Sequence, residues 1–307
     1  MIQISIQEML DAGAHFGHQT RRWNPKMKPY IYGARSGVHI IDLQQTFSLA
    51  QKGLGFLEEV VARGEDVLFV GTKKQAQGVI EEEAKRCSMP YVTHRWMGGT
   101  LTNFQTIKKS VDRLIDLETR RANNDFQGYT KKELLGIDRE IEKFLSVLGG
   151  IRNMKTPPGA LFVVDPGQER IAVHEAEILE IPVVAMTDSN CNPDPIDYPL
   201  PANDDALRSI QLFTVRAADA CLAGLEKREL RAREEGAKGA LDARKRTGRK
   251  LQEMEGAGKA YVSRVDKFEE EEAGMSFSAT VTKEEPRSAA EELAKEAEAD
   301  EKKKEKE

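Results

Sequence analysis

Long apolar runs, paired cysteines and an N-terminal leader pattern are all missing from this sequence. The three cysteines are Cys87, Cys191 and Cys221, and none belongs to a C-x-x-C pair. This spacing suggests neither a disulfide framework nor a thiolate zinc site. No uncharged apolar stretch approaches the roughly 20 residues that a membrane span needs, and no basic segment followed by an apolar run opens the chain. We therefore expect a cytoplasmic protein with inert, reduced thiols.

Common enzyme signatures are also missing. The chain has no G-x-G-x-x-G after a strand, no G-x-x-x-x-G-K-[ST] and no G-x-S-x-G, so nothing marks a nucleotide-dependent enzyme or a hydrolase. "VGTKK" at 70–74 does follow an apolar run and open a helix, where backbone N–H groups favour anions. Lys73 and Lys74 there either meet a phosphate or flank a tight turn. We expect a protein that is not an enzyme and requires no cofactor.

Acidic residues are absent from one stretch. Residues 15–39, beginning "HFGHQTRRWNPKMKPYIYG", contain five Lys or Arg and no Asp or Glu, although the whole chain carries −5. Residues 266–307 hold 8 basic and 15 acidic side chains, so the first 265 residues carry a net charge of +2. Whole-chain charge therefore does not exclude a nucleic-acid partner. The stretch is an ordinary basic loop, a phosphate site or a surface for nucleic acid.

The apolar pattern predicts an α/β fold. Short apolar runs such as "DVLFVG", "ALFVVDP" and "IPVVAM" alternate with amphipathic helical segments, which is typical of a parallel sheet covered on both faces. "VHII" and "PYVT" are further short strand candidates. Ser5 with Glu8, and Asp42, mark helix starts. We predict a doubly wound parallel sheet, flavodoxin-like, formed by residues 1–103 and 150–225.

Two segments depart from this alternation. In residues 104–149 apolar residues recur at steps of three and four on both sides of "RRANNDFQGY", and Thr130 with Glu133 forms a second capping box. This pattern predicts an inserted antiparallel coiled-coil hairpin, the alternative being two helices lying flat on the sheet. Residues 226–307 are charged and poor in large apolar side chains, so we predict a mostly disordered tail.

A metal site is one interpretation of the carboxyl edge of the sheet. Asp188 follows "IPVVAM", Asp204 and Asp205 open the last helix, and His39 would join them if "VHII" packs nearby. Imidazole and carboxylates would hold a structural zinc or magnesium ion there; helix capping by the two aspartates is the alternative. His15 and His18 lack acidic neighbours in sequence, so we expect them to pack or cap the first helix.

Nucleic-acid binding is indicated by a repeated pattern. "RRW" at 21–23 and "HRW" at 94–96 each place an arginine beside a tryptophan, and "GGTLTNFQTIKK" follows the second. Arginine binds phosphate with two hydrogen bonds, and Trp or Arg planes stack on unpaired bases. Either tryptophan would alternatively belong to the core.

At these residues the sequence resembles the bacterial small-subunit ribosomal protein S-two family. The resemblance rests on "AGAHFGHQTRRWNPKMKPYIYGARSGVHIIDL", "FVGTKKQA", "HRWMGGTLTNFQTI", "LGGIRNM" and the stretch from "EAEILEIPVVAM" to "NDDALRSIQL", spanning roughly residues 1–225. It implies a structural role in the 30S subunit, on 16S rRNA at the junction of head and body. It also implies docking of the large mRNA-binding first protein of that subunit, and a divalent ion near His39, Asp188, Asp204 and Asp205.

We predict a set of rRNA-contacting residues from the basic and aromatic side chains and one asparagine in these stretches. They are Arg21, Arg22, Trp23, Lys26, Lys28, Arg35, Lys73, Lys74, Arg95, Trp96, Asn103, Lys108 and Lys109. An adaptor role, in which the hairpin and tail bind proteins, is compatible with this prediction.

Overall fold

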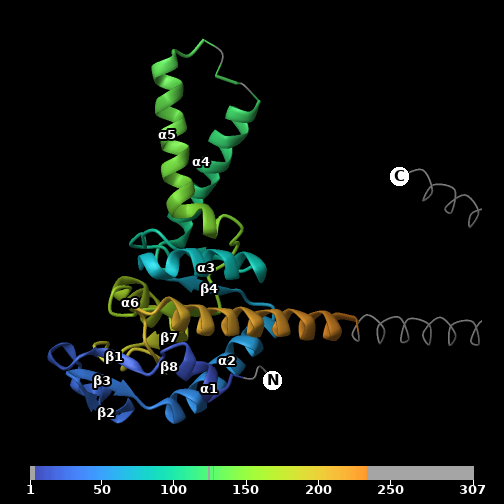
Figure 1. The fold of residues 1–307 in the computed structure, drawn as a ribbon. Helices are drawn as coiled ribbons and strands as arrows, with labels where there is room; N and C mark the ends of the chain where they lie inside the picture. The colour runs from blue at the N-terminus through green and yellow to red at the C-terminus, as the bar shows by residue number, and fades with distance from the viewer. Residues whose placement is uncertain (1–3, 124, 127, 234–307) are drawn as a thin grey trace, which may run out of the picture. The chain divides into compact units, whose positions relative to one another are not determined.

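A five-stranded parallel sheet forms the centre of the molecule (Figure 1). The computed structural model describes residues 4–123, 125–126 and 128–233. The strand order is β5-β4-β6-β7-β8, which in chain order is the 2-1-3-4-5 arrangement of flavodoxin-like folds. The predicted α/β class with a flavodoxin-like parallel sheet is therefore confirmed. The strands are β4 (Val67–Val70), β5 (Tyr91–Val92), β6 (Ala160–Val164), β7 (Val183–Thr187) and β8 (Tyr198–Pro201).

Helices cover both faces of this sheet. On one face, Phe69 and Phe162 pack with α2 (Leu43–Ala62), α3 (Lys74–Arg86) and a terminal helix that runs from residue 207 to 233. On the other face, Leu68 and Val70 of the same strand pack with α6 (Arg170–Ile178) and the start of α4. Successive strand residues point to opposite faces, so every position of β4, β6 and β7 is buried, as the continuous apolar runs predicted.

The predicted helix starts are confirmed. Ser5 and Glu8 form a capping box before α1 (Ile6–Asp11), in which each side chain bonds the backbone N–H of the other residue. Asp42 caps α2 by accepting from the N–H of Gln44. Thr130 and Glu133 form the second capping box, before α5. The side chains of these capping residues accept hydrogen bonds from backbone N–H groups that have no partner within the helix.

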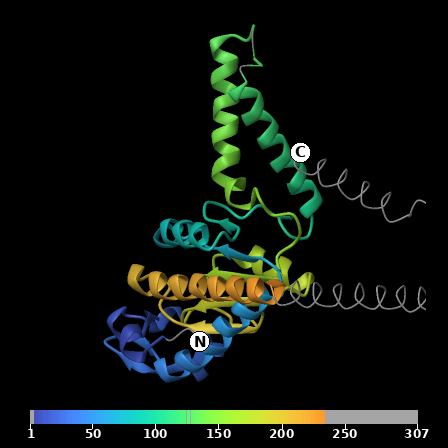
Figure 2. The same cartoon turned by 90° about the vertical axis from the view of Figure 1, so that its right-hand side faces the viewer.

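The inserted segment consists of α4 (Phe104–Ala122) and α5 (Lys131–Leu148), which run alongside one another in both views (Figures 1 and 2). Arg121 pairs with Asp138 at 2.8 Å, and Arg113 pairs with Glu140 at 2.7 Å. The predicted apolar stripe of α5 faces inward only in part, because its side chains are half-buried. They are Leu134, Ile137, Ile141 and Phe144. Two paired helices are thus established; coiled-coil geometry stays a prediction.

A tight return joins the hairpin to the sheet. The 3-10 turn η3 (Gly149–Ile151) follows α5 and passes directly over β5. A Cβ atom on Gly150 would overlap the carbonyl oxygen of Tyr91, so this position requires glycine. The core cluster on that face includes Leu148 and Ile151, with Phe104 and Phe144 packed against it. The base of the hairpin is therefore part of the core.

A second, antiparallel sheet contains the basic stretch. Its order is β1-β3-β2. The prediction that "VHII" is a strand is confirmed, but this strand pairs within the small sheet and not with the parallel one. Sequence analysis assigned no regular structure to the rest of the stretch. The elements are β1 (Phe16–Gln19), η1 (Thr20–Arg22), η2 (Pro25–Tyr30), β2 (Ile31–Arg35) and β3 (Val38–Ile41).

Strand β8 was missed because "DYPLPAN" holds two prolines. Proline removes a ladder donor and is tolerated at sheet edges, and β8 is such an edge, paired only with β7. Thr46 of α2 fixes it by donating its hydroxyl to the carbonyl oxygen of Pro201 at 2.6 Å.

The end of the chain differs in part from the prediction. The terminal helix continues to residue 233, beyond the expected start of a tail at 226. The remainder of the predicted tail, 234–307, lies outside the described residues. Within the part of the chain that the structure describes, no helix combines the length and apolarity needed to cross a membrane.

Candidate functional site

The small sheet is fastened to the carboxyl end of β7. The backbone N–H of His18 donates to Asp188 Oδ1 at 3.2 Å and to Ser189 Oγ at 2.8 Å. The N–H of Asn24 donates to the carbonyl oxygen of Ser189 at 2.8 Å. The first "RRW" segment, residues 21–23, lies between these two anchors. It is therefore held at one defined edge of the parallel sheet.

Most basic side chains of this segment are exposed. Arg21, Arg22, Lys28 and Arg35 are exposed and form no ion pair with another described residue. Lys26 is exposed too, but it pairs with Asp194. Trp23 keeps 38% of its surface exposed and lies 5.4 Å from the ring of His39. An indole braced on one face in this way is available on the other.

The second basic segment starts at the same edge. Arg95 follows β5, and Lys74 follows β4; both side chains are exposed. Lys108 and Lys109 are exposed on the first turns of α4, and exposed Asn103 precedes that helix and accepts from the Thr106 hydroxyl at 2.8 Å. Because carboxyl ends of parallel strands share one edge, segments following β4, β5 and β7 lie along it together.

Trp96 does not belong to the exposed surface, which corrects the prediction. It is 6% exposed and packs in the core cluster with Val92 and Ile107. Its indole N–H donates to Glu175 Oε1 at 3.1 Å. The partner sits on α6, so this side chain closes the loop onto the sheet and is not free to stack on a base.

Glu175 organises this loop and was missed by sequence analysis. Its carboxylate also accepts from the backbone N–H groups of Gly99, Leu101 and Thr102 and from the Thr102 hydroxyl. Burial opposes ionisation, but the bonds from Leu101, Trp96, Gly99 and Thr102 hold the pKa of Glu175 below its ordinary value. A signal existed, since position 175 falls on the helix face of buried Ala172 and Ala176.

Lys73 also leaves the predicted contact set. Its side chain is 13% exposed, and its Nζ lies 2.8 Å from Asp204, 2.5 Å from Asp205 and 3.6 Å from Asp165. Burial opposes the charge, but the bonds to Asp204 and Asp205 raise the pKa of Lys73 above its ordinary value. The ammonium group is therefore an internal counter-ion to three carboxylates, while the adjacent Lys74 stays exposed.

His18, and not His39, joins the aspartates at the carboxyl edge. His18 Nδ1 lies 2.8 Å from Asp188 Oδ2, and Nε2 lies 3.4 Å from Asp205 Oδ2. His39 sits on β3 opposite Ala34, and its two ring nitrogens are buried without a hydrogen-bond partner in the described structure. The prediction named His39 in place of His18: both lie on strands of the small sheet, but β1, which holds His18, is the strand fastened to Asp188.

The cluster has the donor set of a divalent-cation site. His18, Asp188 and Asp204 offer ligand atoms within 4.8 Å of one another, and Asp165, Cys191 and Asp204 form a second such group. Burial, and then the charges of Asp165 and Asp188, raise the pKa of Asp204 to about 7 despite Lys73. Its Oδ2 is buried without a hydrogen bond. Imidazole and carboxylate ligands suit zinc, and carboxylates suit magnesium, so these residues fit the predicted ion.

Relatives resemble the chain over most of this structure. The family model described as "Ribosomal protein S2" matches residues 9–224. The chain belongs to the ribosomal protein S2 family. It is 53% identical to "Small ribosomal subunit protein uS2" of Sorangium cellulosum over 226 residues, which are 74% of this chain and 81% of that protein.

Two further relatives carry the same name. The one from Maridesulfovibrio salexigens is 54% identical over 229 residues, 75% of this chain and 88% of that protein. The one from Geotalea uraniireducens is 52% identical over 245 residues, 79% and 96% of the two chains. The ribosomal protein S2 family consists of structural proteins and not enzymes, so both the suspected family and the prediction of a non-enzyme are confirmed.

Proposed function

We propose that this chain is a structural constituent of the bacterial small (30S) ribosomal subunit, located in the cytoplasm, that lies on 16S rRNA through the carboxyl edge of its parallel sheet. The observation that carries the proposal is the convergence of two exposed basic segments at that edge, one anchored to β7 and one following β5. Phosphate contacts from such residues set orientation. Family membership supports the assembly in which they act.

The proposed contact residues are the exposed members of the predicted set. They are Arg21, Arg22, Trp23, Lys26, Lys28, Arg35, Lys74, Arg95, Asn103, Lys108 and Lys109. Each lysine or arginine would neutralise phosphate charge and release counter-ions, which makes binding salt-dependent. The position at the head–body junction belongs to the same proposal and rests on the sequence resemblance.

Sedimentation of a cell lysate through sucrose gradients tests this role. We expect the chain in stoichiometric amounts in the 30S and 70S peaks, and its release only at high salt. Exchange of both Arg21 and Arg22 for alanine should lower incorporation and reduce the log–log salt slope of 16S rRNA binding by about one unit for each phosphate that is no longer neutralised. Recovery of the wild-type chain only at the top of the gradient would refute the structural role.

The paired helices α4 and α5 are proposed to dock the mRNA-binding first protein of the subunit. Leu135 and Leu145 of α5 are 56% and 41% exposed, and Tyr129 before the helix is 48% exposed. Apolar side chains outside the shared seam supply contact area to a partner. Leu135→Asp combined with Leu145→Asp should deplete that partner from purified 30S subunits and leave this chain bound to them; undiminished partner content would exclude the docking surface.

A divalent ion is proposed at His18, Asp188, Asp204 and Asp205. The ion would neutralise carboxylates that Lys73 only partly balances, and so fasten the small sheet to β7. In this structural role the ion takes part in no chemical reaction.

A further inference from the structure

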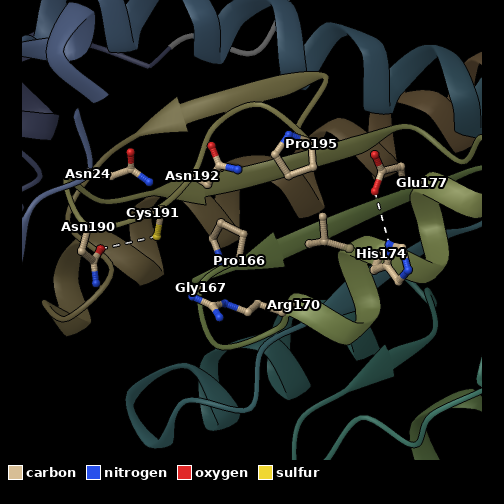
Figure 3. A pocket seen from close by; sticks show the side chains of 11 residues that line it. Asn24, Pro166, Gly167, Arg170, His174, Glu177, Asn190, Cys191, Asn192 and Pro195 are labelled. Atoms are coloured by element: carbon tan, nitrogen blue, oxygen red, sulfur yellow. Dashed lines mark hydrogen bonds and ion pairs between the residues drawn. The ribbon is translucent and has the colours of Figure 1, made fainter. Parts of the chain in front are cut away.

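A cavity of about 260 Å³ lies beside the aspartate cluster, between the β6–α6 turn and the segment after β7 (Figure 3). Its size lies just below the about 300 to 1,000 Å³ found for small-molecule sites. Lys73 and its carboxylates occupy the neighbouring end of β4, so this cavity is an open part of the carboxyl edge. Asn24, which borders it, directly follows the exposed "RRW" segment at 21–23.

Three asparagine side chains of the cavity present donors. Asn24 Oδ1 accepts from the N–H of Lys26 at 3.0 Å, Asn190 Oδ1 from the Cys191 thiol at 3.4 Å, and Asn192 Oδ1 from the N–H of Asp194 at 3.4 Å. An amide whose oxygen is engaged offers its two N–H donors. These three NH₂ groups have no acceptor among the described residues, and Figure 3 shows them along one side of the cavity.

Arg170 adds a charge to these donors. In Figure 3 its side chain extends from the start of α6 toward Asn190 and away from His174. The guanidinium has no ion pair within the described part of the chain, and the nearby Asp194 is paired with Lys26. Asp165 shares the Lys73 ammonium group with two other carboxylates, and Glu177 lies 3.4 Å from His174. The side of the cavity that holds the three amides and this unpaired guanidinium favours a ligand group that carries acceptors and negative charge.

The remaining wall is mixed: it has an apolar part, and Glu177 and His174 also line it. Pro166, Val173 and Pro195 line the cavity beside the donors, and Pro166 and Val173 are buried. A phosphate alone would leave this wall in contact with water, whereas a sugar or a base attached to the phosphate would cover it. Unstacked nucleotides of folded RNA present this combination of groups.

We propose that this cavity, which we call the asparagine pocket, binds one flipped-out nucleotide of ribosomal RNA. Its phosphate contacts Arg170 and the amides of Asn190 and Asn192, and its sugar or base lies against Pro166 and Pro195. This inference rests on the proposed function. The pocket would add one contact that recognises RNA shape to the basic surface, whose binding depends on salt. The same nucleotide chemistry could come from a free nucleotide, and the experiment separates the two sources.

The experiment measures binding of the full chain to 16S rRNA at several salt concentrations. Arg170→Ala should weaken binding by about tenfold and lower the salt slope by about one unit. Asn190→Ala combined with Asn192→Ala should weaken binding at an unchanged slope, because amides carry no charge. Arg139→Ala, which removes an exposed arginine of α5, is the matched control and should change affinity less than twofold. Equal unfolding midpoints would show that each variant folds.

The outcomes separate this inference from the proposed function. If Arg170→Ala binds 16S rRNA as tightly as the wild type, the pocket is not an RNA site, even where alanine at Arg21 and Arg22 weakens binding. If uridine monophosphate titrated into the full chain binds through Arg170 while 16S rRNA affinity is unaffected, the source is a free nucleotide and the inference is overturned. If the wild-type chain does not bind 16S rRNA, the proposed function itself fails.

Discussion

The indole N–H of Trp96 and the carboxylate of Glu175 lie 3.1 Å apart in the core, and this contact joins the "HRW" loop to helix α6. The same carboxylate collects three backbone N–H groups from that loop. Arg95 is thus exposed on a loop whose neighbouring residue is buried and hydrogen-bonded. The presentation of this basic residue depends on an acidic one 80 positions later in the chain.

Replacement of Glu175 by glutamine should destabilise the protein. Glutamine keeps one carbonyl acceptor and turns an N–H₂ group toward buried donors, which leaves at least one backbone N–H without a partner. We expect a loss of about 3 kcal/mol in the free energy of unfolding, measured by urea denaturation. Glu177→Gln on the exposed side of α6 is the control and should cost less than about 0.5 kcal/mol. Equal effects of the two substitutions would contradict the role of Glu175.

The same carboxylate predicts a pH dependence. The pKa of Glu175 is lowered in the folded chain from its ordinary value of 4.5, because the donated bonds outweigh burial. A lowered folded pKa gives stability that is present above the unfolded pKa and lost as the pH falls through the folded one. The stability difference between wild type and Glu175→Gln should therefore be constant at neutral pH and narrow below pH 4.5. A difference unchanged down to about pH 3 would refute this linkage.

Adjacent lysines should give opposite results. Lys73→Met leaves three carboxylates without their buried counter-ion, and we expect it to cost about 3 kcal/mol of folding free energy. Lys74→Met should leave stability unchanged and lower the salt slope of 16S rRNA binding by about one unit. Urea unfolding and filter binding on both variants separate the two roles. If Lys73→Met lowered the salt slope of 16S rRNA binding without a loss of stability, Lys73 would belong to the RNA-binding surface.

The carboxyl-edge cluster predicts stabilisation by a divalent cation. After bound metal is removed with a chelator, titration with zinc or magnesium should raise the midpoint temperature of thermal unfolding. At an ion concentration 100 times the dissociation constant, the free energy of unfolding should rise by about 2.7 kcal/mol. His18→Ala should abolish the increase and His39→Ala should retain it, because only His18 reaches Asp188 and Asp205. If His39→Ala, and not His18→Ala, abolished the rise in the thermal midpoint, His39 would be the metal ligand, as the sequence predicted.

Local signals predicted the fold better than the site. Capping boxes and apolar periodicity involve residues a few positions apart, so the starts of α1, α2 and α5 and the buried strands could be predicted. The site depends on distant contacts. His18 meets an aspartate 170 positions away, and the hydrogen-bond partners of Glu175 lie 73 to 79 positions earlier in the chain. Burial of Lys73 and Trp96 follows from the same long-range packing, which residue type alone does not determine.

The two prolines of β8 have a consequence for the protein before it reaches its RNA. Ala202, just after the strand, donates its N–H to Thr187 of β7. By alternation, positions 199 and 201 face outward, and proline at both leaves the outer side of this edge without those two donors. A second copy therefore finds no ladder to extend there. A newly synthesised chain that is not yet assembled into a ribonucleoprotein is thereby protected against aggregation through this sheet edge.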